Sequence, residues 1–183
     1  MPLAGRLTPT LIDFIRRQPM FFVATAAPSG RVNLSPKGAD TLRVMDETRL
    51  RWLNLSGSGN ETAGHLRQAN RMTLMFCSFV GKPLILRVYG HATTLHPHDD
   101  GWEDAVADFE AMAGSRQVFD VTVESVQTSC GSGVPLMAFN GQRAGDQLVP
   151  FFEEMGPDGV TEYWQRKNAE TIDGFETGVT GGG

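Results

Sequence analysis

Residues 50–62 read LRWLNLSGSGNET and join a strand-like apolar run to a helix-like segment, 63–70, through a loop with two glycines. Because Gly57 and Gly59 carry no side chains, a ligand can closely approach the backbone N–H groups of the loop. The free N–H groups and the dipole at the start of the following helix favour an anion there. The stretch therefore predicts a phosphate-binding loop between a strand and a helix.

The residues around the glycines exclude the commonest phosphate-binding motifs. No Gly-Lys-Ser/Thr follows the glycines, so the loop is not a Walker loop, and without a third glycine it is not a dinucleotide fingerprint. Upstream, the string Ser35-Pro36-Lys37-Gly38 ends another strand-like run and offers one lysine for the same phosphate. We therefore expect a phosphate-bearing cofactor laid across a small antiparallel barrel.

The composition is that of an ordinary folded protein. The chain has 183 residues, 40% of them hydrophobic, and a formal net charge of −5. We expect one domain over residues 1–177 and a glycine-rich tail without fixed structure over 178–183. The negative charge argues against a nucleic-acid partner, because binding to a phosphate backbone usually needs a basic surface.

The cysteines and the lengths of the apolar runs bear on the cellular compartment. Cys77 and Cys130 are too few for a disulfide framework, which fits a reducing compartment. No basic segment precedes an apolar one, and no run nears the roughly 20 apolar residues that span a bilayer. We expect a cytoplasmic protein with no membrane partner. Whether Cys130 is reactive stays open.

Apolar periodicity and turn residues predict the order of the elements. Thr8 and Pro9 begin an amphipathic helix over residues 8–18. Two hairpins follow, and the second delivers the chain into the glycine loop. The remaining expectations are a strand with a bulge at Gly90, an acidic helix, a last strand and an irregular remainder. The hairpins pair 20–26 with 31–35 and 41–45 with 49–55. We expect the bulged strand over 84–95, the acidic helix over 99–112, the last strand over 117–126 and the irregular remainder over 131–183.

The run 71–79 is apolar on both alternate faces, with Met72, Leu74 and Phe76 on one and Met75 and Cys77 on the other. In a small antiparallel barrel one face points into the core, so a helix or a partner subunit must cover the other. We expect a homodimer. Six strands in antiparallel succession with short helices also close more easily than a parallel sheet, whose strands need long crossovers. The predicted fold is mainly β, a six-stranded antiparallel split β-barrel of Greek-key type.

The chain resembles the pyridoxamine 5′-phosphate oxidase-like family of FMN-binding split barrels, and within it a subgroup related to the oxidases. The resemblance covers roughly residues 10 to 175. It rests on six strings of this sequence, which are 32–38, 55–62, 71–76, 86–90, 129–135 and 167–168 with 172–174.

The resemblance implies a homodimer that holds two FMN molecules in the clefts between its subunits. It implies that Lys37 and Thr62 contact the phosphate and that Asn60 and Glu61 hold the loop. Gly59 belongs to that loop, and Arg87 is expected to reach the flavin or to brace Glu61. Residues along the ribityl chain or the ring system would be Ser35, Pro36, Asn54, Leu55 and Ser56.

The chain departs from the true oxidases at the positions that matter for their substrate. Val32 stands where those enzymes have an arginine five residues before the lysine, and Gly59-Asn60-Glu61 replaces a Ser-Arg-Lys phosphate clasp. We therefore expect an FMN-binding flavoprotein, an oxidoreductase acting on an unidentified small molecule rather than on a vitamin B6 phosphate. The alternative is a non-catalytic binding protein for flavin or another planar cofactor, such as heme or a deazaflavin.

The sequence assigns no catalytic residue and no metal. His96 and His98 could bind a metal, but we expect the intervening Pro97 to splay them apart. Glu61 should turn away from a phosphate toward Arg67, Arg71 or Arg87, because two negative charges repel. The substrate, the electron donor and the C-terminal residues that touch the cofactor stay open.

Overall fold

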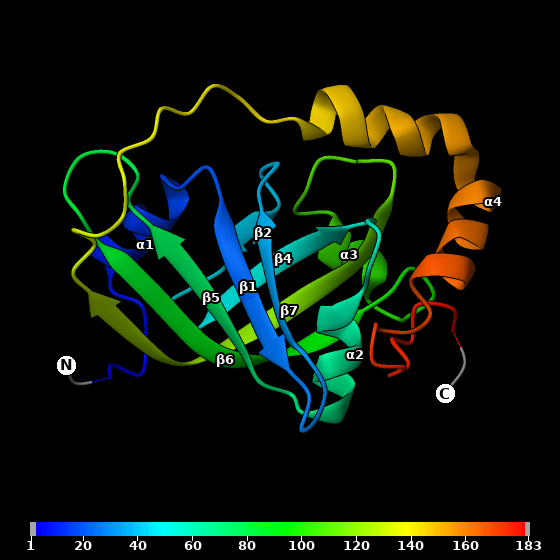
Figure 1. The fold of residues 1–183 in the computed structure, drawn as a ribbon, viewed down its shortest axis with the longest axis horizontal. Coiled ribbons are helices and arrows are strands. Elements are labelled where there is room, and N and C mark those ends of the chain that lie inside the picture. Colours follow the sequence, from blue (N-terminus) through cyan, green and yellow to red (C-terminus); the bar gives the residue numbers. More distant parts are fainter. Residues whose placement is uncertain (1–2, 182–183) are drawn as a thin grey trace.

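The computed structural model describes residues 3–181, and its centre is one antiparallel sheet with the strand order β2-β1-β5-β6-β7-β4-β3 (Figure 1). Seven strands form it rather than the six of the predicted barrel, and the predicted hairpin strand 41–45 is the short edge strand that pairs with β4. The strands are β1 (Phe21–Ala26), β2 (Val32–Lys37), β3 (Leu42–Val44), β4 (Arg49–Leu55), β5 (Met72–Cys77), β6 (Ile85–Leu95) and β7 (Ser115–Ser129).

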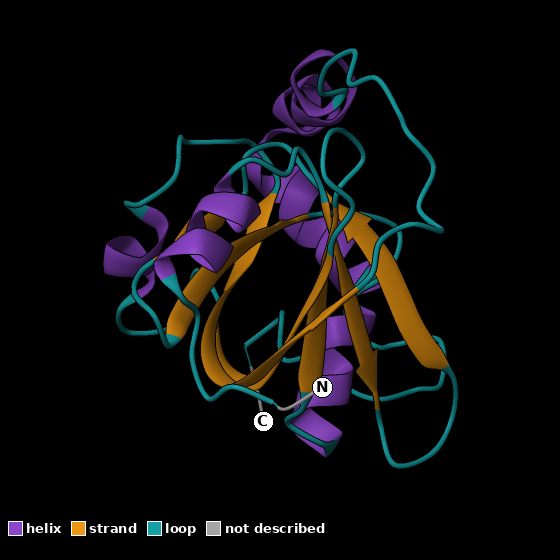
Figure 2. Cartoon of the chain, turned by 90° about the vertical axis from the view of Figure 1, so that its left-hand side faces the viewer, coloured by secondary structure: helices purple, strands orange, loops and turns teal. Residues whose placement is uncertain are grey.

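The sheet curls into a split barrel, and Figure 2 shows its strands curving round a common interior. One cause of the curvature is a register shift between Tyr89 and Gly90, where β6 pairs with β7. A Cβ at Gly90 would lie 2.0 Å from the carbonyl oxygen of Thr122, so only glycine allows this approach. The curl brings β2 over β4, and the Lys37 ammonium lies 5.2 Å from the centre of the Trp52 ring. The predicted bulge at Gly90 is confirmed.

Stacked aromatic rings fill the interior of the barrel. Trp52 stacks on Phe119 with ring centres 4.7 Å apart and meets the edge of Phe21 at 6.0 Å. The inner face of β5 is buried as predicted, since Met72 and Leu74 belong to this core. On the outer face of the sheet the apolar side chains are less covered: Met75 is half-buried, and Val32 and Leu34 of β2 are 75% and 63% exposed.

Helix α1 (Pro9–Arg16) begins as predicted, with the Thr8 hydroxyl accepting a hydrogen bond from the Leu11 N–H. Helix α3 (Trp102–Val106) is much shorter than the predicted 99–112. The following turn is held by arginines of the sheet instead, because the Asp108 carbonyl accepts from Arg43 and its carboxylate from Arg51. Trp102 and Phe109 nevertheless pack together in a second, smaller core.

The C-terminal part is helical, which the sequence did not predict. A short π-helix, η1 (Ala144–Leu148), leads into α4 (Val149–Lys167), which kinks at Gly156 (φ 69°, ψ 169°) just before Pro157. Only Phe152 and Val160 of α4 are buried, so its apolar stripe is too sparse to recognise as a helical pattern.

Part of the glycine-rich tail contacts the rest of the fold. Val179 is only 3% exposed, so this part of the tail packs against the fold, while residues 182–183 lie outside the described range.

Helix α2 (Glu61–Gln68) is the helix predicted after the glycine loop. Within residues 3–181, no helix combines the length and the apolar character needed to cross a membrane.

Candidate functional site

A cavity of about 920 Å³ opens between the end of β2, the β4–α2 loop and the chain that follows β7. Arg87, the tenth predicted site residue, does not line it. The other nine do, and they are Ser35, Pro36, Lys37, Asn54, Leu55, Ser56, Gly59, Asn60 and Thr62. The structure therefore gathers two distant strings of the sequence, 35–37 and 54–62, around one space.

Two cations face this cavity, the half-buried Lys37 from β2 and the buried Arg116 from β7. Arg116 is only 2% exposed, and burial lowers its pKa to about 9, so it remains charged at neutral pH. Burial, together with the charge of Arg116, lowers the pKa of Lys37 to about 8. Within residues 3–181 neither side chain forms an ion pair with a carboxylate. Two desolvated positive charges without a counter-charge form a binding site for an anion.

Arg116 is also incompletely hydrogen-bonded. Its Nη1 donates to the Gly59 carbonyl oxygen at 3.0 Å, while its Nε is buried without a partner among the described residues. A buried guanidinium N–H without an acceptor is costly, and a ligand oxygen would satisfy it. Arg116 is not among the predicted site residues, because a single arginine at the start of a strand carries no local signal.

The glycine loop leaves room on its surface rather than adopting an unusual backbone. A Cβ at Gly57 would meet nothing within 4 Å, and one at Gly59 would meet only the Glu61 Oε1 atom at 3.3 Å. Neither glycine has a left-handed φ, so the backbone itself does not require glycine at either position. What the two glycines provide is space beside the backbone, which a side chain would fill.

Residues from the far C-terminus hold the loop in place. Asn168 donates to the Gly57 carbonyl oxygen at 2.9 Å, and its own carbonyl accepts from the Asn60 side chain at 3.3 Å. The Asn60 amide oxygen accepts from Gln117 at 2.7 Å. Asn60 therefore occupies the N-cap position of α2 without capping it, because its side chain is engaged in these bonds. Its role is to fix the loop, as the family resemblance implies.

Helix α4 contributes a further brace, since Trp164 donates from its ring nitrogen to the Ser56 hydroxyl at 2.7 Å. The Ser56 hydroxyl in turn donates to the Gly114 carbonyl oxygen at 2.7 Å. Trp164 therefore tethers the loop to helix α4.

Glu61 also lines the cavity, and its carboxylate does not pair with an arginine as predicted. Its two carboxylate oxygens accept from the Ile172 N–H at 3.1 and 3.2 Å. The backbone of the C-terminal segment supplies this donor, which sequence spacing could not reveal. The neighbouring Thr62 hydroxyl accepts from Asn33 at 3.2 Å, so its own O–H remains available as a donor.

Arg87 lies on the outer face of the sheet, where it stands beside Met75 of β5 and Gln127 of β7 in the strand pairing. Its guanidinium donates to the Ser129 hydroxyl at 3.0 Å. Arg87 therefore neither lines the cavity nor braces Glu61 in its own chain.

A long connection, residues 130–148, forms the outer wall of the cavity, and we call it the strap. Figure 1 shows it running over the end of the sheet from β7 to α4. The Met137 N–H donates to the Phe79 carbonyl at 3.0 Å, and the Gln142 side chain donates to the Pro19 carbonyl at 2.8 Å. Its cavity-lining residues are Phe139, Gly141, Gln142, Arg143, Ala144, Gln147 and Leu148.

The predicted splaying of the two histidines is wrong. His96 and His98 stack with ring centres 5.2 Å apart and planes 4° from parallel, because a turn from His96 to Asp99 brings them to one side. With Asp99 they place three possible ligand atoms within 4.8 Å of one another. Nitrogen lone pairs lie in the ring plane, so those of parallel rings do not converge on one ion. This cluster is separate from the cavity described above.

The chain is similar to known proteins in both sequence and fold. The sequence model of the family described as pyridoxamine 5′-phosphate oxidase matches residues 7–130. A pyridoxamine 5′-phosphate oxidase family protein of Aspergillus flavus, ustO, is 32% identical over 185 residues, which cover 92% of this chain and 74% of the fungal protein.

Two solved structures share the fold at low sequence identity. HupZ of Group A Streptococcus superposes with a TM-score of 0.54 at 18% identity, covering 73% of this chain and 99% of HupZ. A candidate pyridoxamine 5′-phosphate oxidase of Lactobacillus delbrueckii gives a TM-score of 0.55 at 19% identity, covering 69% and 99% of the two chains. The shared part is the split barrel.

Proposed function

Because this chain belongs to the pyridoxamine 5′-phosphate oxidase family, we propose that it binds FMN in the cavity beside the glycine loop. We further propose that it is an oxidoreductase that exchanges hydride or electrons with a small organic substrate. A cavity of about 920 Å³ falls within the range of about 300–1,000 Å³ typical of small-molecule sites.

The observation that carries the proposal is a pair of desolvated cations that form no ion pair, the half-buried Lys37 and the buried Arg116, next to a glycine loop. A phosphate monoester carries between one and a half and two negative charges at neutral pH and three acceptor oxygens. It can therefore neutralise both cations and accept from the unpartnered Arg116 Nε. The free hydroxyl of Thr62 and the backbone N–H groups of the loop are further donors for the same group.

The substrate is proposed to differ from a vitamin B6 phosphate. Val32, which replaces the arginine of the true oxidases, is 75% exposed on the outer side of β2. Arg116 supplies a buried guanidinium to the cavity from a different strand, β7. Arg116 does not restore the Ser-Arg-Lys phosphate clasp of the true oxidases, because Gly59, Asn60 and Glu61 stand in its place.

Bound flavin supplies the redox chemistry, and the protein supplies orientation and charge. In this proposal Lys37 and Arg116 hold the phosphate, and Asn54, Leu55 and Ser56 line the path along which the rest of the cofactor lies. The protein thereby positions a flavin ring between the β4 wall and the strap. No catalytic acid or base is assigned to this chain.

We also propose that the protein is a homodimer. The outer face of the sheet carries Val32, Leu34 and the half-buried Met75, and a contiguous apolar face of this kind marks an interface. A second copy packed there would place Arg87 in the interface.

The two free cysteines fit a reducing cytoplasm, which is the compartment that we propose.

Met75→Asp tests the dimer, since it places a charge on that face. We expect sedimentation velocity to show a monomer or an insoluble protein that retains less flavin. A soluble dimer with unchanged flavin content would place the interface elsewhere.

The visible spectrum tests the function. Protein incubated with FMN and freed of excess cofactor should show flavin absorbance, which NADH or NADPH under anaerobic conditions should bleach and air should restore. A flavin spectrum that no reductant bleaches would indicate a passive binder. Colourless protein would contradict flavin binding. An intense absorbance band near the short-wavelength end of the visible spectrum, after incubation with heme, would favour heme as the cofactor.

A further inference from the structure

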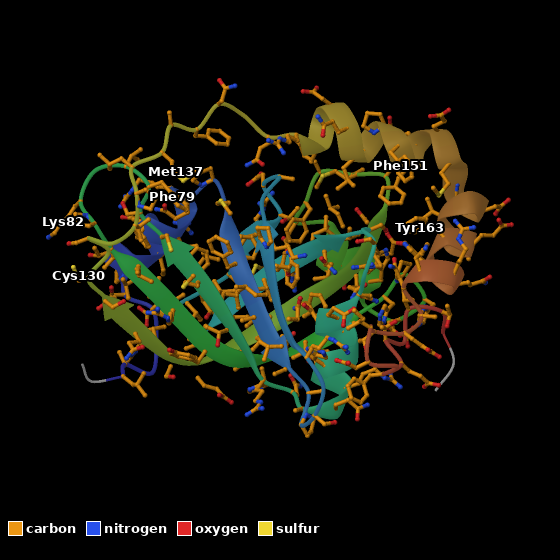
Figure 3. The ribbon with its side chains drawn as sticks, viewed as in Figure 1. Phe79, Lys82, Cys130, Met137, Phe151 and Tyr163 are labelled. Atoms are coloured by element: carbon orange, nitrogen blue, oxygen red, sulfur yellow. The ribbon has the colours of Figure 1, made fainter. Side chains whose placement is uncertain are left out.

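A second cavity, also of about 920 Å³, lies on the other side of the strap, and we call it the strap cavity. It is enclosed by the end of α1, the β5–β6 turn and the strap itself. Figure 3 shows Phe79 and Met137 where the strap passes over that turn, with Lys82 at the outer edge. None of the predicted cofactor residues lines it.

The interior of the strap cavity is apolar. Phe14 of α1 is buried at its base, while Phe79 and Leu84 line it from either side of the β5–β6 turn. Met137, 54% exposed, and Phe139, 60% exposed, complete it from the strap. These apolar groups face water unless a ligand covers them, so the cavity favours a ligand with an apolar body.

The rim of the strap cavity is positively charged. Arg16, Arg17 and Lys82 line it, and none of them forms an ion pair among residues 3–181. Asp40 also lines it, but its carboxylate is engaged by Arg43 at 3.1 and 3.2 Å. Three free cations around an apolar floor match a ligand that carries an acidic group on an apolar body.

The strap cavity adjoins the cavity proposed for FMN. Pro19, Phe139 and Gln142 line both, and the hydrogen bond from Gln142 to the Pro19 carbonyl lies in the partition between them. A ligand in the strap cavity would therefore lie next to the open side of the flavin site. Displacing the Gln142 side chain would join the two spaces.

We propose that the strap cavity binds an organic acid with an aromatic or aliphatic body, and that this acid is the substrate class of the enzyme. The assignment as substrate rests on the proposed flavin chemistry, whereas binding of the acid does not. Arg17 and Lys82 hold the acidic group, and Phe79, Met137 and Phe139 contact the apolar body.

A matched pair of dyes tests the proposal by isothermal titration calorimetry. 1-Anilinonaphthalene-8-sulfonate has an apolar body and a sulfonate, and N-phenyl-1-naphthylamine has nearly the same body without the charge. The double variant Arg17→Glu, Lys82→Glu should bind the sulfonate about tenfold or more weakly and the neutral dye within twofold of the parent. The control Arg71→Glu changes an exposed arginine outside both cavities and should leave both affinities unchanged.

Equal loss of the two dyes in the double variant, or no loss of either, would overturn the proposal. Met137→Ser should weaken both dyes about threefold, because it removes apolar contact without touching a charge; no change would also overturn it. Sedimentation velocity at the same protein concentration measures whether the protein is a dimer. If the parent protein is a dimer and binds neither dye, the strap cavity is a subunit contact and the proposal is wrong.

The variant Lys37→Met separates this inference from the proposed function. It should weaken FMN and leave sulfonate binding unchanged. Sulfonate binding that depends on Arg17 and Lys82, in a protein that never binds FMN, would refute the flavin proposal alone. FMN binding without the charge-dependent sulfonate binding would refute the present inference alone.

Discussion

The two walls of the cavity proposed for FMN are built in different ways. The inner wall combines β2, β4 and the glycine loop, and its residues are fixed by strand pairing and by the side chains of Gln117, Trp164 and Asn168. The strap is tied to the barrel mainly through Met137 and Gln142, one hydrogen bond each. Many mutual bonds make a segment rigid, whereas few bonds and exposed apolar groups mark a segment that opens easily.

This difference suggests a division of labour between the walls. Binding of a cofactor phosphate gains from donors that are already in position, because ordering them costs free energy. The inner wall provides this. The strap separates the cofactor site from the strap cavity, so its smaller constraint suits the entry of a substrate. Changes to the inner wall should therefore affect FMN strongly, and changes to the strap should affect it weakly.

Gly59→Val should have the largest effect on FMN. The valine side chain would occupy the space that the glycine loop leaves beside its backbone, and FMN affinity should fall about a hundredfold or more. The melting temperature without ligand should change little, since the added Cβ meets only a Glu61 oxygen. Flavin fluorescence quenching measures the affinity.

Gly133→Val in the strap is the matched control, because a Cβ there meets nothing within 4 Å. Its FMN affinity should stay within threefold of the parent. Equal losses in the two variants would remove the distinction between the walls.

Arg116→Met should come next, with FMN affinity falling by about one to two decades, since a charge-assisted hydrogen bond contributes about 1.5–3 kcal/mol. Without FMN the variant should be as stable as the parent or more stable, because it removes a buried cation that has no counter-charge. Urea unfolding with and without FMN measures both effects. A less stable protein with unchanged FMN affinity would make Arg116 a structural residue.

The pH dependence of binding should report Lys37. The free protein holds this lysine at a pKa of about 8, and bound phosphate favours its charged form. FMN affinity should therefore be level between about pH 7 and pH 8 and fall above pH 8, by up to about tenfold per pH unit. In Lys37→Met the fall should begin only near pH 9, where Arg116 loses its proton. An identical alkaline fall in that variant would assign it to another group.

Stability without ligand should show the opposite trend at the same residue. The folded protein holds Lys37 at a lower pKa than the unfolded chain, so between pH 8 and 10.5 the unfolded chain binds more protons. The free energy of unfolding contributed by this group therefore rises with pH across that window. Lys37→Met should lack the rise in urea unfolding measured from pH 7.5 to 9, and above pH 9 it should keep the smaller rise that Arg116 contributes.

Phe139→Ala should have the smallest effect on FMN. The side chain lines both cavities and is 60% exposed, so its loss should change FMN affinity by less than about threefold. The Michaelis constant of an acid substrate should rise more than that. A tenfold loss of FMN affinity would show that the strap helps to hold the cofactor.

The split barrel and one side of the site follow from local sequence signals. Lys37 and the glycine loop are recognisable because their neighbours form short strings, and Gly90 because it interrupts a long strand. Arg116 is not recognisable: it reaches the loop 57 residues after Gly59, and only the curl of the sheet brings them together.

The C-terminal part escapes prediction for a related reason. Asn168 acts on Gly57 across 111 residues, which no local pattern reveals. Helix α4 combines Gly156 and Pro157 with a sparse apolar stripe, so its period is hidden. The sequence thus predicts elements whose partners are near in the chain, and it fails where the chain returns from a distance.

The central claim is that Lys37, Arg116 and the glycine loop hold a phosphate, and comparing FMN with riboflavin tests it most directly. The two ligands share the ring system and the ribityl chain and differ only in the phosphate. Titration of the parent protein at pH 7 should give an affinity for FMN about a hundredfold or more above that for riboflavin, and Arg116→Met should narrow the gap. Equal affinities for FMN and riboflavin would contradict the claim.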